Sequence, residues 1–184
     1  MDYSGFLHII IGPMFSGKST KLINEINTLK IYKKNILIIN SKKDTRIHTN
    51  SIKTHNNVTF NAQKLDNLNI SIIPDLVKKY DVIAIDEAQF FDDLIPFIHE
   101  LLKYNIYIIL SGLNGDRYQK KFGYILDLIP LANKVDKLSG ICNICNNGTP
   151  GDFTSIKNNT HKNTNQILIG DDNIFICVCR KHIQ

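Results

Sequence analysis

Residues 12–20, which read GPMFSGKST, have the residue types and the spacing that bind a polyphosphate. They fit the pattern G-x-x-x-x-G-K-[ST], whose glycines let backbone N–H groups point at phosphate oxygens. In such a loop Lys18 reaches the β- and γ-phosphates, and the Ser19 hydroxyl ligates Mg²⁺. An apolar run precedes the loop and a helical pattern follows it, which a glycine turn without a ligand would not require. We therefore predict a site for a nucleoside triphosphate with Mg²⁺. Its contacts are Gly12, Pro13, Met14, Phe15, Ser16, Gly17, Lys18, Ser19 and Thr20.

Two adjacent carboxylates, Asp86 and Glu87, follow a second apolar run and are the expected partners of this loop. In parallel α/β sheets, ligands collect at the carboxyl ends of strands, where the loop and both acids would lie. Asp86 would orient metal-bound water, and Glu87 would accept a proton from an attacking group. If that group is water the protein is an ATPase, and if it is a hydroxyl the protein is a small-molecule kinase. The alternative for Glu87 is a cap on the next helix.

Cysteine and histidine residues in the last quarter of the chain have the spacing of metal ligands. The pairs Cys142-x-x-Cys145 and Cys179-x-x-His182 supply four ligands to a tetrahedral Zn²⁺, and such a closed site is structural. The alternatives are four unrelated thiols or a redox pair, although a redox pair usually begins a helix in a thioredoxin-like unit, which the sequence lacks. Cys177 could compete as a ligand, but we expect it to be a buried thiol.

These groups need a scaffold, and the hydrophobic pattern predicts one in which strands and helices alternate. We expect strands at 5–11, 35–40, 81–86, 105–110 and 135–138. We expect helices at 20–31, at 92–104 with Asp92 or Asp93 as its cap, in parts of 65–80, and weakly at 126–133; residues 41–61 are a polar loop with one short strand. This order predicts an α/β fold with a mostly parallel sheet and helices on both faces. The composition changes at Gly140, so we expect an α/β domain at 1–139 and a small zinc-anchored domain at 140–184.

Length, composition and charge exclude other classes of protein. A chain of 184 residues that is 43% hydrophobic can form a packed core. No apolar run approaches the roughly 20 residues of a membrane span, and the first residues show no secretory signal, which favours the cytosol. The net charge of +5 would suit a zinc module that binds nucleic acid. Residues 140–149, however, lack the interleaved basic and aromatic side chains of such a module, so we expect neither nucleic acid nor a membrane as a partner.

Together the motifs resemble those of the type II thymidine kinases, the family of the human cytosolic and poxvirus enzymes. The loop filling Pro13-Met14-Phe15 resembles that of the family, and Lys43-Asp44-Thr45-Arg46 is similar to its K-D-T-R. Residues 86–91, DEAQFF, resemble the signature D-E-[GA]-Q-F-F. Residues 111–116 and Phe122-Gly123 match the acceptor side of the family, so that the resemblance extends from Gly5 to His182.

The resemblance implies a phosphate-loop (RecA-like) fold with a zinc-binding lasso that closes over the nucleoside. It implies ATP- and Mg²⁺-dependent phosphorylation of the 5′-hydroxyl of thymidine; departures from the family near the base, at Arg117 and Phe175, lead us to expect deoxyuridine as a second acceptor. By the same resemblance Glu87 is the general base, and Lys18 and Arg46 stabilise charge on the transferring phosphoryl group. The triphosphate site then also includes Asp44, Thr45, Arg46, Asp86, Glu87, Ala88 and Gln89.

The implied nucleoside pocket reads the thymine edge through main-chain groups, and a tight wall beside the methyl group excludes purines. Its residues are Met14, Phe90, Leu113, Arg117, Phe122, Thr154, Gln166, Ile167, Leu168, Ile169, Gly170 and Phe175. Two departures from the family bear on selectivity. Either Arg117 or Tyr118 takes a place where the family carries Phe, and Phe175 replaces a common Tyr. The resemblance also implies a homotetramer and feedback inhibition by dTTP.

Overall fold

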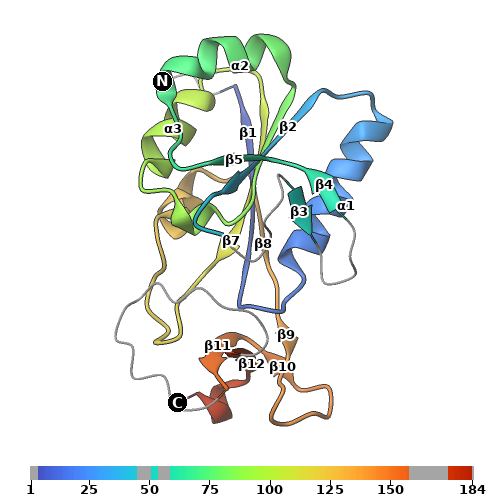
Figure 1. The fold of residues 1–184 in the computed structure, drawn as a ribbon, viewed down its shortest axis with the longest axis vertical. Coiled ribbons are helices and arrows are strands. Elements are labelled where there is room, and N and C mark those ends of the chain that lie inside the picture. Colours follow the sequence, from blue (N-terminus) through green and yellow to red (C-terminus); the bar gives the residue numbers. More distant parts are fainter. Residues whose placement is uncertain (1–3, 45–50, 54–58, 158–173, 184) are drawn as a thin grey trace.

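A six-stranded sheet in which every neighbouring pair is parallel forms the centre of the computed structural model (Figure 1). The structure describes residues 4–44, 51–53, 59–157 and 174–183. The strand order is β5-β2-β6-β7-β1-β8. The strands are β1 (Phe6–Gly12), β2 (Ile36–Ser41), β5 (Gln63–Leu65), β6 (Val82–Ile85), β7 (Tyr107–Leu113) and β8 (Lys134–Lys137). Since all six run in one direction, the loops that leave their carboxyl ends form a common surface.

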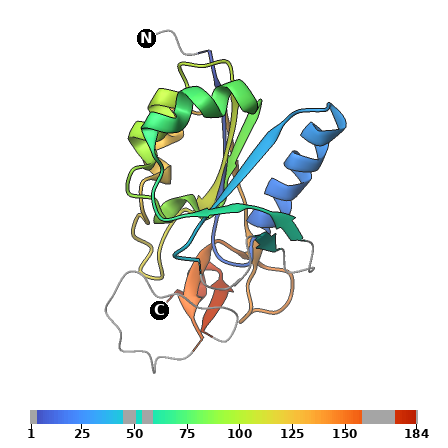
Figure 2. The ribbon, with the colours of Figure 1, turned by 45° about the horizontal axis from the view of Figure 1, so that its top comes forward.

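Different helices cover the two faces of this sheet, because successive residues of a strand point to opposite sides. The helices are α1 (Lys18–Ile31), α2 (Ile73–Lys79), α3 (Leu94–Leu101) and the 3-10 helix η3 (Ile125–Leu131). On β1, Ile9 belongs to the core that includes residues of α2, α3 and η3, whereas Ile10 belongs to the core beneath α1. Figure 2 shows α1 alone on one side of the sheet and the green helices on the other. The predicted α/β fold with helices on both faces is confirmed.

The chain between β2 and β6 departs from the prediction. Two short strands, β3 (Ser51–Lys53) and β4 (Thr59–Asn61), pair antiparallel where we predict one. The strand β5 lies where the predicted helical stretch begins, and helix is confined to η1 (Ile70–Ile72) and α2. Each of these strands has three residues, which is too short for an alternating pattern to show in the sequence.

The predicted helix at 92–104 is shorter in the structure, where α3 ends at Leu101, and its predicted cap residue makes a different hydrogen bond. Asp93 occupies the N-cap position of α3, but its side chain does not cap the helix. Its Oδ2 instead accepts a hydrogen bond of 2.7 Å from the backbone N–H of Leu68, which ties the segment before α2 to α3. The weak helix predicted at 126–133 is the 3-10 helix η3, whose Pro130 has no N–H to donate.

From Gly140 onward the chain forms short antiparallel pairs of strands. The strand β9 (Gly140–Ile141) pairs with β10 (Pro150–Gly151), and β11 (Phe153–Ile156) pairs with β12 (Phe175–Val178), which leads to the 3-10 helix η4 (Arg180–His182). Figure 1 shows this orange-to-red part beyond the carboxyl-end edge of the sheet. The division into domains at 1–139 and 140–184 stays a prediction. Among the described residues, the helices are too short or too polar to cross a membrane.

Truncation of a large side chain in the core should lower the stability of the protein. Phe97 on α3 is 1% exposed and packs in the larger core. Its replacement by Ala removes the ring and leaves a cavity, so we expect Phe97→Ala to lower the free energy of unfolding by about 3–5 kcal/mol. Tyr32→Ala is the control, because Tyr32 is 71% exposed and its loss should change stability by less than about 0.5 kcal/mol. Urea denaturation measures both, and equal losses would contradict the packing of α3.

Candidate active site

The loop between β1 and α1 has the backbone shape of an anion-binding loop. Phe15 and Gly17 have positive φ values of 63° and 81°, which turn successive N–H groups toward one side. Gly17 is also the N-cap of α1 and offers no side-chain cap, so the N–H groups of the first turn add positive potential. The buried ammonium of Lys18 donates to the carbonyl oxygen of Pro13 at 2.7 Å and thus spans the loop.

The hydroxyl of Ser19 and the carboxylate of Asp86 bring oxygen ligands together beside this loop. Asp86 directly follows β6, and its Oδ2 accepts a hydrogen bond of 3.2 Å from Ser19 Oγ. Oxygens in adjacent positions around Mg²⁺, at about 2.1 Å from the ion, lie about 3 Å apart. The spacing of the two oxygens is compatible with a cation at the loop, and the predicted Mg²⁺, with Ser19 as a ligand and Asp86 orienting metal-bound water, stays a prediction.

Glu87 lies in the tight turn between β6 and the 3-10 helix η2 (Ala88–Phe90). Its φ of 51° places a bulky residue in the left-handed region, and its side chain is 6% exposed. The side chain makes no cap hydrogen bond to η2, which removes the capping alternative. Instead Glu87 Oε2 accepts a hydrogen bond of 2.5 Å from Gln89 Nε2. A neighbouring side chain thus holds this carboxylate in one orientation.

Gln89 joins this carboxylate to the end of β7. Its Oε1 accepts a hydrogen bond of 3.0 Å from the backbone N–H of Leu113, while its amide nitrogen holds Glu87. Two glycines make room for it: a Cβ on Gly112 would lie 2.6 Å from Gln89 Oε1, and a Cβ on Gly123 would overlap the Gln89 backbone. The resemblance implies that Gln89 contacts the triphosphate; in the structure its side chain connects Glu87, which follows β6, to the end of β7.

Another buried carboxylate, Asp44, follows β2. Asn40 Nδ2 donates to Asp44 Oδ2 at 3.3 Å, and Lys64 Nζ donates to the Asp44 carbonyl oxygen at 3.0 Å. Sequence reasoning missed Asn40 and Lys64; the available signal for Asn40 was a polar residue at the end of an apolar strand. The predicted contacts Thr45 and Arg46 lie outside the described residues.

The predicted acceptor side brings aromatic and cationic groups together. The rings of Phe90 and Phe122 meet edge to face with centroids 5.6 Å apart. Lys43 Nζ donates to the Phe90 carbonyl oxygen at 3.1 Å, which fixes the turn after Glu87. Of the two residues that could replace the family's Phe, Arg117 is buried, whereas Tyr118 is 48% exposed and lies with its ring beneath the Arg117 guanidinium.

The zinc-anchored part meets the phosphate loop at Thr154. Its Oγ1 accepts a hydrogen bond of 3.0 Å from the backbone N–H of Met14. Phe175, buried on β12, pairs with Ile156 on the same ladder. Thr154 and Phe175, two residues of the predicted nucleoside pocket, thus lie on one pair of strands. Their roles in binding the nucleoside stay predictions. The pocket residues that lie outside the described part are Gln166, Ile167, Leu168, Ile169 and Gly170.

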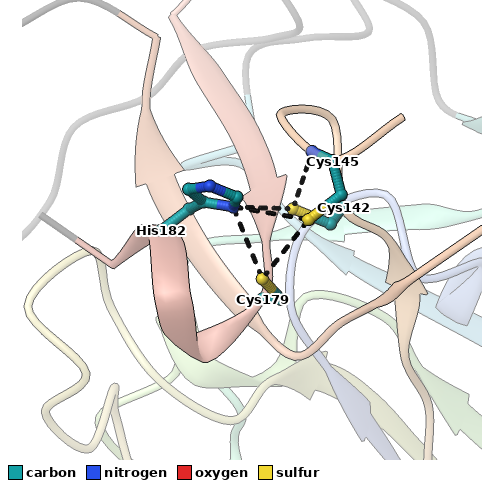
Figure 3. A group of neighbouring side chains, drawn as sticks. All are labelled: Cys142, Cys145, Cys179 and His182. Carbon is teal, nitrogen blue, oxygen red and sulfur yellow. Dashed lines mark hydrogen bonds between the residues drawn. The ribbon is translucent and has the colours of Figure 1, made fainter. Parts of the chain in front are cut away.

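The four predicted zinc ligands lie within one cluster and point toward a common centre (Figure 3). His182 Nδ1 lies 3.5 Å from the sulfurs of Cys145 and Cys179 and 3.6 Å from that of Cys142. The sulfurs of Cys145 and Cys179 are 3.8 Å apart. Ligands of a tetrahedral zinc with bonds of about 2.3 Å to sulfur and about 2.0 Å to nitrogen lie about 3.5–3.8 Å from one another. The distances fit zinc without rearrangement.

The acidity of the thiols also suits a cation. Burial opposes ionisation of Cys142, but backbone hydrogen bonds from Cys145 and Cys179 and the His182 side chain outweigh it and lower the pKa of Cys142 to about 5. Burial and the neighbouring cysteines raise the pKa of Cys145. A dication relieves the repulsion between such thiolates. Cys177 stands apart from the cluster: burial raises its pKa, and its Sγ donates to the Gly151 carbonyl oxygen at 3.2 Å, which agrees with the predicted buried thiol.

A second group of possible ligands, His8, Glu25 and Asp136, lies between β1, α1 and β8. His8 Nε2 and Asp136 Oδ2 are 2.9 Å apart. Burial lowers the pKa of His8, although the hydrogen bond to Asp136 acts to raise it. Lys21 and Lys134 each form ion pairs with both Glu25 and Asp136. The two lysines already balance the two carboxylates, so this group is a structural ion-pair network.

Comparison with known proteins agrees with this site. A family model described as thymidine kinase matches residues 5–183. The chain belongs to the thymidine kinase family. Thymidine kinase a of Arabidopsis thaliana is 40% identical, over 97% of this chain and 75% of that protein. The thymidine kinase of Sheeppox virus is 36% identical over 98% and 97%, and that of Mycoplasma genitalium is 38% identical over 97% and 83%.

Membership of the thymidine kinase family makes the protein a kinase, which confirms the resemblance seen in the motifs. The described geometry is consistent with this: the loop around Lys18 suits a nucleotide donor, and Glu87 is held beside it. The catalytic and binding roles of the individual residues, and the binding of Mg²⁺, stay proposals.

The cluster predicts one zinc per chain. We expect elemental analysis of the purified protein to find about one equivalent, and Cys145→Ser to lose most of it, because three ligands hold zinc far less tightly than four. Cys177→Ser is the matched control and should keep its zinc, since Cys177 bonds to Gly151 instead. Equal zinc loss in both variants would contradict the assignment of the four ligands.

Proposed function

We propose that the protein transfers the γ-phosphate of ATP to the 5′-hydroxyl of thymidine, and of deoxyuridine, to form the nucleoside monophosphate for DNA synthesis. Its family and the names of its relatives support thymidine as the acceptor. The observation that carries the proposal is the buried carboxylate of Glu87, which Gln89 holds next to the Ser19–Asp86 pair. A base fixed beside the donor phosphates is what an acceptor hydroxyl requires.

In the proposed reaction Glu87 takes the proton of the 5′-hydroxyl as its oxygen attacks the γ-phosphorus. A new oxygen–phosphorus bond forms, the bond to the bridging oxygen breaks, and ADP leaves. Lys18 and Arg46 stabilise charge on the transferring group, which in phosphoryl transfer is the main catalytic task. Bound Mg²⁺, held by Ser19 and Asp86, would offset charge on the phosphate oxygens. The proposed donor contacts continue through Asp44 and Thr45.

The proposed selectivity lies on the acceptor side. Phe90 would stack on the base, with its own position set by the edge of Phe122 and by Lys43. The buried Arg117, rather than the exposed Tyr118, would occupy the place beside the base where the family carries Phe. A cation at this place, together with a Phe175 that has no hydroxyl, supports a less strict choice between thymidine and deoxyuridine.

Further features follow from the family and are proposed on that basis alone. They are a homotetramer and feedback inhibition by dTTP, which would place its base in the nucleoside pocket. A cytoplasmic location is proposed because ATP and the reduced thiolates of a zinc site belong to a reducing compartment.

The acceptor is tested by the release of ADP. We expect ADP release that depends on thymidine or deoxyuridine and that is weak with deoxycytidine and deoxyguanosine, since a pocket that pairs with one base edge leaves polar groups unpaired against another. A coupled assay across the four nucleosides with Mg-ATP measures this. ADP release that is the same with and without nucleosides would indicate an ATPase in which Glu87 activates water, and would overturn the kinase.

The general base is tested by Glu87→Gln. The glutamine oxygen can still accept the hydrogen bond from Gln89, so the fold and ATP binding should persist. It cannot take a proton, so we expect kcat to fall by about 10²–10⁴-fold. Glu100→Gln is the matched control, because Glu100 lies on α3 and pairs with Lys103, which follows the helix. Steady-state kinetics decide the matter, and an unchanged kcat for Glu87→Gln would remove Glu87 from the role of base.

A further inference from the structure

The zinc-anchored part touches the phosphate loop at two successive residues, Met14 and Phe15. Thr154 Oγ1 accepts the hydrogen bond of Met14 N–H. Gly140 lies against the next residue so closely that an added Cβ would be 3.1 Å from the Phe15 carbonyl oxygen. The same Cβ would be 2.8 Å from Cys177 Sγ. The thiol, the glycine and the loop backbone are therefore packed together.

Thr154 and Cys177 form one unit. They are directly paired across the ladder of β11 and β12. The Cys177 side chain is fully buried, and its Sγ occupies space left by two glycines: Cβ atoms on Gly140 and Gly151 would lie 2.8 and 2.6 Å from the sulfur. A side chain of this size and no larger fits between the ladder and the loop.

This unit is tied to the zinc cluster through Asn143, which lies between the ligands Cys142 and Cys145. The backbone N–H of Cys177 donates to Asn143 Oδ1 at 2.9 Å, and the backbone N–H of Asn143 donates to the Cys177 carbonyl oxygen at 2.9 Å. Two bonds between the same residues hold Cys177 in register with the turn that carries the first two ligands. Cys179, the third ligand, follows two residues later.

We propose that Thr154 and Cys177 are positioning residues that hold the Met14–Phe15 segment in its phosphate-binding shape, and that Asn143 makes this shape depend on the zinc cluster. The zinc-anchored part thus acts on the donor site as well as on the nucleoside. The inference rests on the proposed function only in that the loop binds ATP.

The backbone of the loop explains why such support is needed. Phe15 has a φ of 63°, a conformation that costs a non-glycine residue energy and persists where the surroundings hold it. The N–H of Met14 would lose its partner without the Thr154 hydroxyl. Loss of either contact lets the segment relax, and its N–H groups then no longer point toward the phosphates.

The test measures binding of a fluorescent, non-hydrolysable Mg-ATP analogue in the absence of nucleoside, so that nucleoside contacts do not contribute. We expect Thr154→Val, which keeps the shape and removes the acceptor, to bind the analogue roughly tenfold more weakly. Thr154→Ser should restore most of the affinity. Thr28→Val is the control, because the exposed Thr28 hydroxyl donates to Asn24 on α1. If Thr154→Val binds the analogue as tightly as wild type and raises only KM for thymidine, the proposal is wrong.

The link to zinc is tested by Asn143→Ala, which keeps all four ligands. We expect it to retain one zinc by elemental analysis and to bind the analogue several-fold more weakly. Combined with Thr154→Val, the loss should be smaller than the product of the two separate losses, because both act on one contact. If the two losses of affinity multiply in the double variant, Asn143 and Thr154 act independently and the proposed link to the zinc cluster is wrong. If Asn143→Ala fails to fold, Cys177→Ala is the second test, because it removes the sulfur that packs against Gly140 and Gly151. It should weaken binding of the analogue, and unchanged binding would contradict the proposal.

The outcomes separate this inference from the proposed function. A wild-type protein that binds the analogue but phosphorylates no nucleoside would overturn the kinase proposal, while a weaker Thr154→Val would still support the positioning role. If the wild-type protein phosphorylates thymidine and Thr154→Val binds the analogue with full affinity, the kinase proposal stands and the positioning role is overturned. Wild-type protein that binds no analogue would overturn both.

Discussion

The parallel register of β1, β6 and β7 is the constraint on which the active site depends. Gly12 at the end of β1 is level with Leu113 at the end of β7, and Ile85 at the end of β6 pairs with Leu110. The phosphate loop, the two carboxylates and the acceptor-side strand therefore leave the sheet at one edge. A slip of one residue would turn every side chain of a strand to the other face. Because each face has its own core, such a slip would break both, so the cores hold the site in register.

Gln89 transmits this register to the carboxylate that would act as the base. It is 3% exposed, and its two polar atoms are both satisfied, one by Glu87 and one by the Leu113 N–H. A buried amide with one end unpaired would cost about 1–3 kcal/mol, so the bridge favours the arrangement in which both strand ends are in place. Gly112 leaves the space for the oxygen of this amide, and Gly123 leaves the space for the Gln89 backbone. Glu87 can then remain in a left-handed conformation that its own sequence does not favour.

The parts that the sequence predicted are those in which one short segment determines both structure and chemistry. The phosphate loop, the acids after β6 and the zinc ligands each combine spacing with a distinct residue type, and buried strands produce long apolar runs. The parts that it missed depend on partners distant in the chain. Asp93 is typical of a helix cap, yet it bonds to Leu68, and β5 is a strand only because the edge of β2 offers it a partner. Asn40 and Lys64 likewise meet Asp44 through folding that no local pattern records.

The phosphate loop is restrained from two sides, and the two restraints differ in kind. The ammonium of Lys18 donates a hydrogen bond to the Pro13 carbonyl oxygen, which is a neutral acceptor. A phosphate that binds to the loop would offer the same ammonium a stronger, charge-assisted hydrogen bond. That contact can therefore be exchanged when a ligand binds. The Thr154 hydroxyl accepts a hydrogen bond from the Met14 N–H. Thr154 belongs to the β11–β12 ladder, and a ladder of two strands is only marginally stable alone in water. A structural zinc held by Cys142, Cys145, Cys179 and His182 would supply on the order of 10 kcal/mol and so would stabilise this ladder. The Lys18 contact can thus be exchanged when a ligand binds, whereas the Thr154 contact would stay in place.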